Sequence, residues 1–318
     1  MRKFLLSLLL IICMFPVFGN ESSKNNYDYL IPRSQNSFGG IGSVITPTAR
    51  FSDDGEFTFG LSKELPYNRI YAKMQFMPWM EAVLKYTETT HYSYNNSFVQ
   101  TWKDKGIDVK FRLLEEGKSN FGLLNESLIP ELAVGINDIG GTGSYDSQYI
   151  VASKRISQKL DLTMGLGFGR LAGAEHINNP IDGIFDSFST YSPNGGTLNI
   201  GRWFSGPKAA FFGGFEYLTP INNLTLKVEY DSTDYSNIIN KPMYYDKNPQ
   251  DIITIDSRIN YALNYRLNIG TRDKLDFSIG SIHGNTIYAN VAVHSNLNDP
   301  IRDKYTAPAE NIINSNLL

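Results

Sequence analysis

The sequence predicts an all-β protein: an antiparallel transmembrane β-barrel of about 12 strands, preceded by a signal peptide. The first observation is the alternation of apolar and polar residues in segment after segment, most clearly over residues 160–169. Successive side chains of a strand point to opposite faces, so this pattern gives each strand one apolar and one polar face. The second observation is that long and short connections alternate, as they do in bacterial outer-membrane barrels.

Alternation and turn residues place the strands along the chain. The predicted strands cover residues 55–64, 69–77, 80–90, 104–114, 131–138, 146–155, 159–169, 209–217, 223–231, 255–266, 274–282 and 286–295. The longest connections share one end of this barrel: 91–103, 170–208 and 232–254. Short ones fall at the other end: Pro78-Trp79, Ser157-Gln158 and 218–222. Two connections are exceptions: 115–130 is too long for its end, and the tight hairpin His283-Gly284-Asn285 is short for its end. A further strand is possible at 197–204, and it would make the number of strands odd.

The N-terminus resembles a cleaved secretory signal. Arg2 and Lys3 form a short positive region, residues 4–15 are apolar, and Val17-x-Gly19 offers small residues for cleavage. An uncleaved anchor is disfavoured because a membrane-spanning helix needs roughly 20 apolar residues. We therefore expect secretion to the outer membrane of a Gram-negative bacterium.

Cysteine usage adds a second constraint. Cys13 is the one cysteine of the chain and lies within the predicted signal. Lipid attachment would require small residues before it, but Ile11 and Ile12 precede it. No lipoprotein processing is expected, and the mature chain would lack disulfides and thiolate chemistry.

The chain divides into four predicted segments. They are a signal peptide at 1–19, an N-terminal lead-in at 20–54, a β-barrel domain at 55–297 and a polar tail or linker at 298–318. Gly39 to Gly42 and Pro47 lie in the lead-in. An ordinary turn-rich approach to the first strand is the favoured interpretation. A partial plug in the barrel mouth is the alternative, because glycines permit a close approach of the backbone.

Composition excludes several classes of protein. The net charge of −3 argues against nucleic-acid binding. The mean hydropathy of −0.25 argues against a helical membrane protein but permits a barrel, in which only alternate side chains meet lipid. A soluble β-sandwich is the alternative fold that the alternation also permits. It is disfavoured because Lys110, Arg112, Lys227 and Glu229 lie deep within strands, where they suit a solvated interior.

The candidate ligand-binding residues face the predicted lumen. Asp108, Lys110 and Arg112 share one face by period two, and Lys227 and Glu229 occupy another strand. One interpretation is a contact path for an acidic or hydroxyl-rich glycan. The favoured interpretation is salt bridging within the wall, with partners drawn from Glu81, Lys85 and Glu229.

Aromatic residues near strand ends are interpreted as interfacial girdles, with sugar stacking at Trp79 or Trp102 as the alternative if these face the lumen. The girdle residues are Tyr67, Trp79, Tyr86, Trp102, Tyr217 and Tyr230.

Catalytic and cofactor signatures are weak. The four histidines are scattered without metal-ligand spacing, so no metal, no cofactor and no catalytic residue is predicted. Gly140-Gly141-Thr142-Gly143 sits between two strands and has no following lysine, so a hairpin turn is favoured over a phosphate loop. The protein is therefore not expected to be an enzyme, although a site assembled in space is invisible in sequence.

An ordered set of motifs over residues 39–297 resembles the YjbH-type exopolysaccharide-biosynthesis family. The set includes Gly39-Gly40-Ile41-Gly42, Thr46-Pro47-Thr48-Ala49-Arg50, Pro78-Trp79-Met80-Glu81, Lys103-Asp104-Lys105-Gly106, Asp138-Ile139-Gly140-Gly141, Phe212-Gly213-Gly214 and Gly284-Asn285-Thr286. The resemblance implies an outer-membrane barrel that helps to export or assemble an extracellular polysaccharide. The implied partners are outer-membrane lipid, the polysaccharide and other envelope export proteins, with no nucleic acid.

The chain also departs from that family. Members are usually about twice as long, with a second barrel-like half, so a truncated member or a separate protein supplying that half is expected. Ile282-His283 replaces the Glu-Arg that often precedes Gly-Asn-Thr. A general or substrate-specific porin is the second functional hypothesis, and a lipid- or glycan-modifying barrel enzyme is the third.

Overall fold

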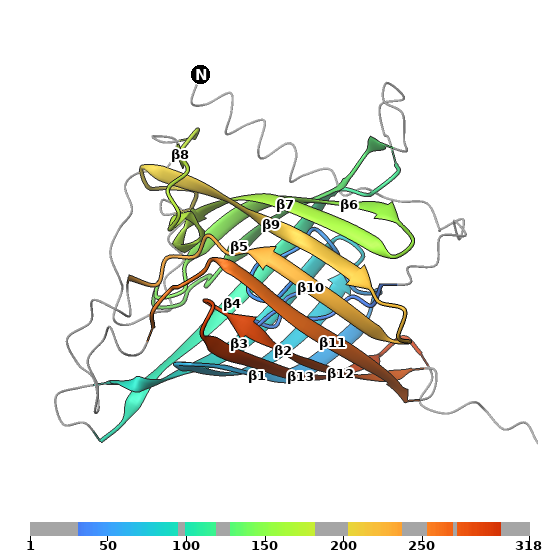
Figure 1. The fold of residues 1–318 in the computed structure, drawn as a ribbon, viewed down its shortest axis with the longest axis horizontal. Helices are drawn as coiled ribbons and strands as arrows, with labels where there is room; N and C mark the ends of the chain where they lie inside the picture. Colours follow the sequence, from blue (N-terminus) through green and yellow to red (C-terminus); the bar gives the residue numbers. More distant parts are fainter. Residues whose placement is uncertain are drawn as a thin grey trace, which may run out of the picture.

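The computed structural model describes residues 31–94, 99–118, 128–181, 203–236, 253–269 and 272–299. In these residues, twelve antiparallel strands close into one barrel, and the short strand β8 (Ile177–Asn178) pairs with β9 outside it (Figure 1). The barrel strands are β1 (Glu56–Glu64), β2 (Tyr67–Met77), β3 (Met80–Ser93), β4 (Thr101–Leu114), β5 (Glu131–Asn137), β6 (Ser147–Ser157), β7 (Leu160–Gly169), β9 (Lys208–Leu218), β10 (Leu224–Tyr230), β11 (Ile259–Ile269), β12 (Asp273–Ile282) and β13 (Thr286–Asn296).

Two pairings close the barrel. β13 pairs with β1 from Glu56↔Asn296 to Glu64↔Tyr288, joining the first and last strands described. β7 pairs with β9 because β8 lies aside, and β9 then pairs with β10. Every other barrel strand pairs with its neighbour in sequence. A closed sheet leaves no unpaired edge, which a lipid environment demands.

The predicted strand pattern is confirmed. The largest difference is at β11, predicted over 255–266 and found at Ile259–Ile269. The N–H groups of Asp256 and Ser257 bond instead to the carbonyl of His283, so these residues meet the β12–β13 hairpin rather than β10. The short strand β8 was not predicted. Of the further strand considered at 197–204, residues 197–202 lie outside the described part, as do the signal peptide at 1–19 and nearly all of the tail at 298–318.

The two ends of the barrel differ as expected. The connections after β3, β5, β7 and β10 lie at one end, called here the long-loop end. The turns after β2, β6 and β9 lie at the opposite, short-turn end. The β12–β13 hairpin is tight because His283 and Gly284 both have positive φ (58° and 80°), the geometry of a two-residue primed turn.

Burial alternates along the strands. On β1, Glu56, Thr58 and Ser62 point inward and are buried, whereas Phe59 and Leu61 point outward and are 48 % and 50 % exposed. The outer wall carries many further exposed apolar side chains: Ile70, Leu84, Ile107, Leu162, Met164, Tyr261, Leu263, Tyr265, Ile279, Val291 and Val293. Soluble monomers rarely show contiguous apolar surface on this scale, so the wall is built to face lipid. Among the described residues, no helix is long and apolar enough to cross a membrane.

Inward-facing glycines make room for aromatic rings on the neighbouring strand. Gly60 pairs with Tyr71, Gly135 with Tyr149 and Gly165 with Phe212, and a Cβ at each glycine would meet the partner's ring. The ring therefore lies flat over a glycine of the next strand, a device that also stabilises sheets elsewhere.

We expect Gly135→Val to destabilise the barrel by about 1–3 kcal/mol, because the added side chain overpacks the space that the Tyr149 ring fills. Samples are heated to a series of temperatures and then run on a gel without further heating. The temperature at which the fast-migrating, folded band disappears measures the loss of stability. Ala152→Val, on the same sheet but only half-buried and facing outward, is the control. An unchanged transition temperature in Gly135→Val would contradict the packing argument.

Candidate functional site: a chain segment held inside the barrel

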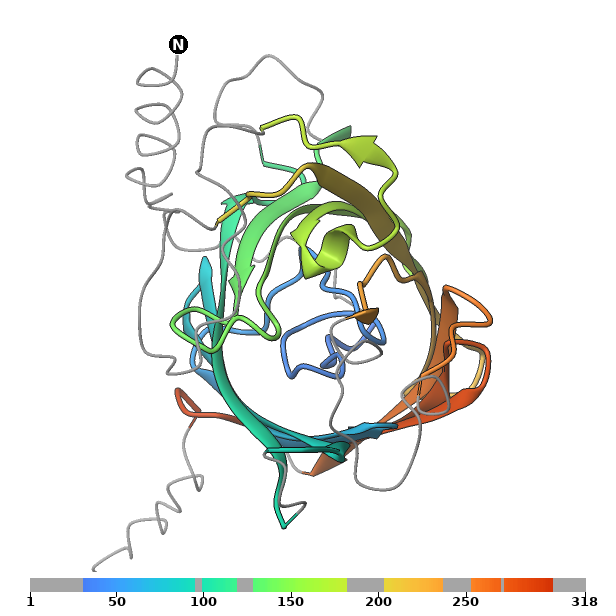
Figure 2. The same ribbon diagram turned by 90° about the vertical axis from the view of Figure 1, so that its left-hand side faces the viewer.

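Residues 31–52, called here the lumen segment, lie inside the barrel (Figure 2). Two short backbone pairings fold the segment back on itself, Gln35 with Ile41 and Gly42 with Pro47. At Gly39, φ is +95° and a side chain would meet the ring of Tyr71, so only glycine fits this turn against the wall. The sequence predicts a lead-in over 20–54, and the structure describes it from residue 31 onward. Most of its described residues lie inside the barrel rather than in front of it.

Glu229 on β10 holds the middle of the lumen segment. Its carboxylate accepts the backbone N–H groups of Val44, Ile45 and Thr46 at 2.9, 2.8 and 3.0 Å. The hydroxyl of Thr46 donates to it at 2.8 Å, and Asn260 on β11 donates at 2.9 Å. Three successive N–H groups that converge on one carboxylate form a backbone anion nest. Glu229 therefore acts as the anion that orders this turn.

Two lysines hold the carbonyl groups of the segment. The Lys227 ammonium donates to the carbonyls of Gly42 and Ser43 at 2.6 and 3.0 Å, and pairs with Glu216 at 3.2 Å. On the facing wall, the Lys110 ammonium donates to the carbonyls of Ile41, Thr48 and Arg50 at 3.2, 3.4 and 2.7 Å. The carbonyl of Ile41 also accepts the N–H of Thr48 at 3.3 Å. The carbonyls of Gly42, Ser43 and Thr48 have no backbone donor among the described residues, so the lysines satisfy acceptors that would otherwise be buried unpaired.

Arg50 anchors the end of the segment. Its guanidinium forms a two-bond contact with Asp161 on β7 at 2.7 and 2.8 Å. It also contacts Glu131 on β5 at 2.8 Å and Glu116, in the β4–β5 connection, at 2.6 Å. The side chain is 3 % exposed. Charge-assisted bidentate bonds of this kind are among the strongest polar contacts in proteins.

The remaining candidates pair within the wall. Asp108 accepts the Lys85 ammonium at 2.5 and 2.6 Å and the backbone N–H of Asp138 at 2.8 Å. Arg112 donates to Glu131 at 2.7 Å, and its guanidinium lies 4.6 Å from the centre of the Phe51 ring. Glu81 pairs with Lys110 at 3.2 Å. Two of the expected salt-bridge partners, Glu81 and Lys85, are therefore in place.

All five predicted residues face the lumen, but they do not form one site. Asp108, Lys110 and Arg112 lie on β4, whereas Lys227 and Glu229 lie on β10, five strands away around the closed sheet by way of β5, β6, β7 and β9. The lumen segment bridges the two groups. Arg50, Glu131 and Asp161 were missed as functional candidates, although the inward parity of the two acids and the motif position of Arg50 were visible in the sequence.

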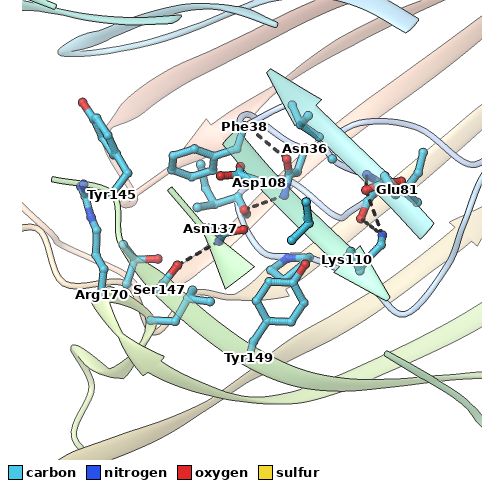
Figure 3. Close-up of a pocket in the computed structure, with 18 residues that line it drawn as sticks. Asn36, Phe38, Glu81, Asp108, Lys110, Asn137, Tyr145, Ser147, Tyr149 and Arg170 are labelled. Carbon is cyan, nitrogen blue, oxygen red and sulfur yellow. Dashed lines mark hydrogen bonds and ion pairs between the residues drawn. The ribbon is translucent and has the colours of Figure 1, made fainter. Parts of the chain in front are cut away.

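A small cavity lies beside the segment among the described residues. This cavity, of about 40 Å³, lies between Ile41, Glu81, Lys110, Tyr149 and Arg170 (Figure 3). Such a volume holds a few water molecules. Pockets for drug-sized ligands measure about 300 Å³ or more, so this cavity does not hold a sugar chain.

Aromatic rings and arginines close the long-loop end above the segment. The Arg69 guanidinium lies 4.3 Å from the ring centre of Phe38 and 4.4 Å from that of Tyr67. The Arg170 guanidinium lies 4.8 Å from the Tyr145 ring, which meets Phe38 edge-on at 6.2 Å. A cation is attracted to the face of an aromatic ring, and the attraction is stronger when both groups are removed from water. The tip of the lumen segment thus packs into this cluster.

Two of the residues assigned to interfacial girdles are therefore misassigned. Tyr67 is buried inside the long-loop end. Trp102 also has inward parity on β4, and its ring stacks with that of Tyr94 at 5.6 Å. Tyr86 and Tyr217 do face outward and are 36 % exposed, as girdle residues would be.

Asp138 lies in the β5–β6 connection, beyond the end of β5, next to the glycine motif. One oxygen of its carboxylate accepts the N–H groups of Gly143 and Tyr145 at 3.1 and 3.3 Å, which folds this connection as a turn rather than a phosphate loop. The other oxygen is buried and has no hydrogen-bond partner among the described residues. Burial raises the pKa of Asp138 to about 6; Lys85 opposes this rise, and Asp104 and Asp108 reinforce it.

This shift predicts a pH dependence of stability. Between about pH 4 and pH 6 the folded state holds a proton on Asp138 that the unfolded state has lost, so the free energy of unfolding falls as the pH rises through this window. The loss should be on the order of 2–3 kcal/mol, and Asp138→Asn should remove it. Urea unfolding at pH 4, 5, 6 and 7 measures the difference. Asp256→Asn, at an exposed loop position, is the charge-matched control, and parallel curves for wild type and Asp138→Asn would refute the assignment.

A family model and a relative in Escherichia coli match most of this sequence. The family model described as exopolysaccharide biosynthesis protein YbjH matches residues 34–315. The uncharacterized lipoprotein YjbH of Escherichia coli (strain K12) is 35 % identical over 312 residues, covering 96 % of this chain. The chain spans 40 % of that relative's length. That name calls the relative a lipoprotein, whereas no lipid attachment is predicted here at Cys13, which lies outside the described residues.

Solved barrels show only a distant likeness. The KdgM porin is 10 % identical with a TM-score of 0.38, over 76 % of this chain and 98 % of that one. A triple mutant of the Rhodopseudomonas blastica porin is 12 % identical with a TM-score of 0.28, over 72 % of this chain and 55 % of that one. Because these scores are low, the function of this barrel has to be inferred from its own contacts.

Proposed function

The chain belongs to the YjbH exopolysaccharide biosynthesis family, and we propose that its barrel assists the export or assembly of an extracellular polysaccharide in the outer membrane without acting as an enzyme. The apolar outer wall supports a membrane location, because water would leave its exposed aromatic and aliphatic side chains unfavourably hydrated. The partners in this proposal are outer-membrane lipid, the polysaccharide and other envelope export proteins.

One observation carries the proposal: the charged groups of the lumen hold the backbone of the lumen segment. Lys110 and Lys227 bind carbonyl oxygens, and Glu229 binds N–H and hydroxyl donors. The two lysines can bind the hydroxyl, carboxylate or phosphate oxygens of a glycan in the same way, and Glu229 can accept hydrogen bonds from its hydroxyl groups. In this proposal, polymer and lumen segment compete for Lys110, Lys227 and Glu229. These residues, with Asp108 and Arg112 beside them in the wall, meet the glycan only after the segment moves aside.

A permanently open diffusion pore is the alternative, and the cavity of about 40 Å³ beside the segment argues against it. Single-channel recording in planar bilayers separates the two functions. A resting, closed barrel gives little conductance, whereas a general porin conducts steadily and selects solutes by size. Loss of an activity on single substitution of a His or carboxylate in a folded barrel would instead favour a lipid- or glycan-modifying enzyme.

The cellular test is to delete the protein and measure polysaccharide in the periplasm and outside the cell in the same cultures. The proposal expects less polymer outside, with material retained or altered in the periplasm, and restoration by the wild-type chain. Unchanged polymer in both compartments would separate this protein from polysaccharide export, and the porin function would then lead.

A further inference from the structure

A second feature lies on the outer wall, away from the lumen. A cleft of about 920 Å³ runs over the outer faces of β2, β3 and β4 towards the long-loop end. Its floor includes the outward-facing side chains of Ile70, Leu84 and Ile107, which are exposed. Lys103 and Lys105 line its upper part. The cleft therefore has an apolar floor and a cationic rim.

The strand register fixes the level of these lysines relative to the apolar wall. Cross-strand partners form three outward-facing rows: Lys63, Asn68, Glu88 and Lys103; then Leu61, Ile70, Tyr86 and Lys105; then Phe59, Ala72, Leu84 and Ile107. The first row is polar and the third is apolar. Lys105 lies in the middle row, where the apolar side chains of these strands begin.

Lys105 carries a charge that none of the described residues neutralises. Its side chain is exposed, and its ammonium has no hydrogen bond or ion pair with any residue in the described ranges. Lys103 donates to the hydroxyl of Thr101 at 2.9 Å and lies 3.8 Å from Glu88. Asp104 also lines the cleft, but its side chain has inward parity on β4, and its carboxylate accepts the backbone N–H of Lys105 and the hydroxyl of Thr142. An ammonium at an apolar boundary needs a counter-ion, and here the neighbouring protein groups leave that position open.

We propose that this cleft binds a phosphate-bearing lipid of the outer leaflet, with an acyl chain along the apolar floor and the phosphate on Lys105, beside Lys103. Charge and shape agree with this occupant, because the apolar floor and the cationic rim follow the order of chain and headgroup along a lipid. The inference depends on the membrane location of the barrel but not on its role in polysaccharide export.

Equilibrium binding to the purified, detergent-solubilised barrel tests the site with two probes, lipid A and the same lipid with its phosphates removed. We expect Lys105→Ala to bind lipid A about fivefold more weakly and Lys105→Glu about 25-fold more weakly. Neither variant should change the binding of the dephosphorylated lipid. Leu84→Trp, which fills the floor of the cleft, should weaken both probes.

Lys159→Ala, at an exposed turn of the short-turn end, is the matched control and should bind like the wild type. Fast migration on an unheated gel shows that each variant is folded. Equal binding of both lipids by the wild type, or unchanged binding of lipid A by Lys105→Glu, would overturn the site while leaving the barrel and its export role intact. Displacement of lipid A by millimolar inorganic phosphate alone, or a barrel dimer abolished by Leu84→Trp with lipid binding unchanged, would also overturn it.

Discussion

Replacing Arg50 with methionine is expected to open the lumen and to give a conductance that the wild-type barrel lacks. Methionine keeps much of the volume of the side chain but removes the guanidinium that contacts Glu116, Glu131 and Asp161. Glu131 keeps its contact with Arg112 and Glu116 keeps its contact with Lys154, but Asp161 loses the one cation that the described residues place beside it. Breaking a buried ion pair by removing one partner costs about 3–5 kcal/mol, because the remaining charge is left uncompensated.

The cost falls on the position of the lumen segment rather than on the closed sheet. Every strand keeps its backbone pairing, whereas residues near Arg50 lose their strongest contact with β5 and β7. Water can then solvate the freed carboxylate of Asp161 only if the end of the segment moves away from the wall. We therefore expect the folded barrel to survive and the lumen to become hydrated.

Planar-bilayer recording measures the effect, with urea unfolding as the measure of stability. Arg272→Met is the control, since Arg272 lies at the short-turn end, where it donates to Ser295 and lies 3.7 Å from Asp273, both outside the lumen segment. A closed Arg50→Met barrel with unchanged stability would show that the segment is held by other groups. Steady conductance in the wild type would refute the closed state itself.

The strands could be predicted from the sequence because their pattern is local. Period-two alternation places Asp108 and Lys110 on one face without knowledge of any other strand, and both do face the lumen. The errors arose at strand ends, where the predicted strand began too late to show which face a residue is on. Tyr67 and Trp102 were placed just outside predicted strands, but β2 begins at Tyr67 and β4 at Thr101, which continues the inward face through both residues.

The position of the lumen segment could not be predicted in the same way. Its residues have no periodicity, and their partners lie far along the chain: Asp161 is 111 positions from Arg50, and Glu229 is 185 positions from Val44. Glycine and proline in this stretch indicated turns but not where the turns lie. Only the closed sheet brings β7 and β10 around the same stretch of backbone.

Glu229→Gln should loosen the middle of the same segment by a separate route. The carboxylate accepts three N–H groups, one hydroxyl and the amide of Asn260, all of which are donors. Glutamine offers one acceptor oxygen, and its own amide group would point at donors. Hydrogen bonds to a charged group are worth about 1.5–3 kcal/mol each, so we expect a loss of about 3 kcal/mol after rearrangement.

The effect on the lumen should be smaller than that of Arg50→Met when each change is made alone. Glu229 holds residues 44–46 on β10, while Arg50 still holds the end of the segment on β5 and β7. Brief openings rather than steady conductance are expected from Glu229→Gln. Glu88→Gln, on the outer face at the long-loop end, is the matched control and should stay closed.

The double variant decides whether these two contacts act as independent anchors of one gate. If each anchor alone keeps the segment inside, losing both should give a steady conductance larger than the sum of the single effects, because Lys110 is then the one charged group described that still holds residues 44–50, through the carbonyls of Thr48 and Arg50. Conductance in the double variant equal to that of Arg50→Met would mean that Glu229 orders the turn without restraining its exit. In that case Arg50 alone would control the opening of the lumen.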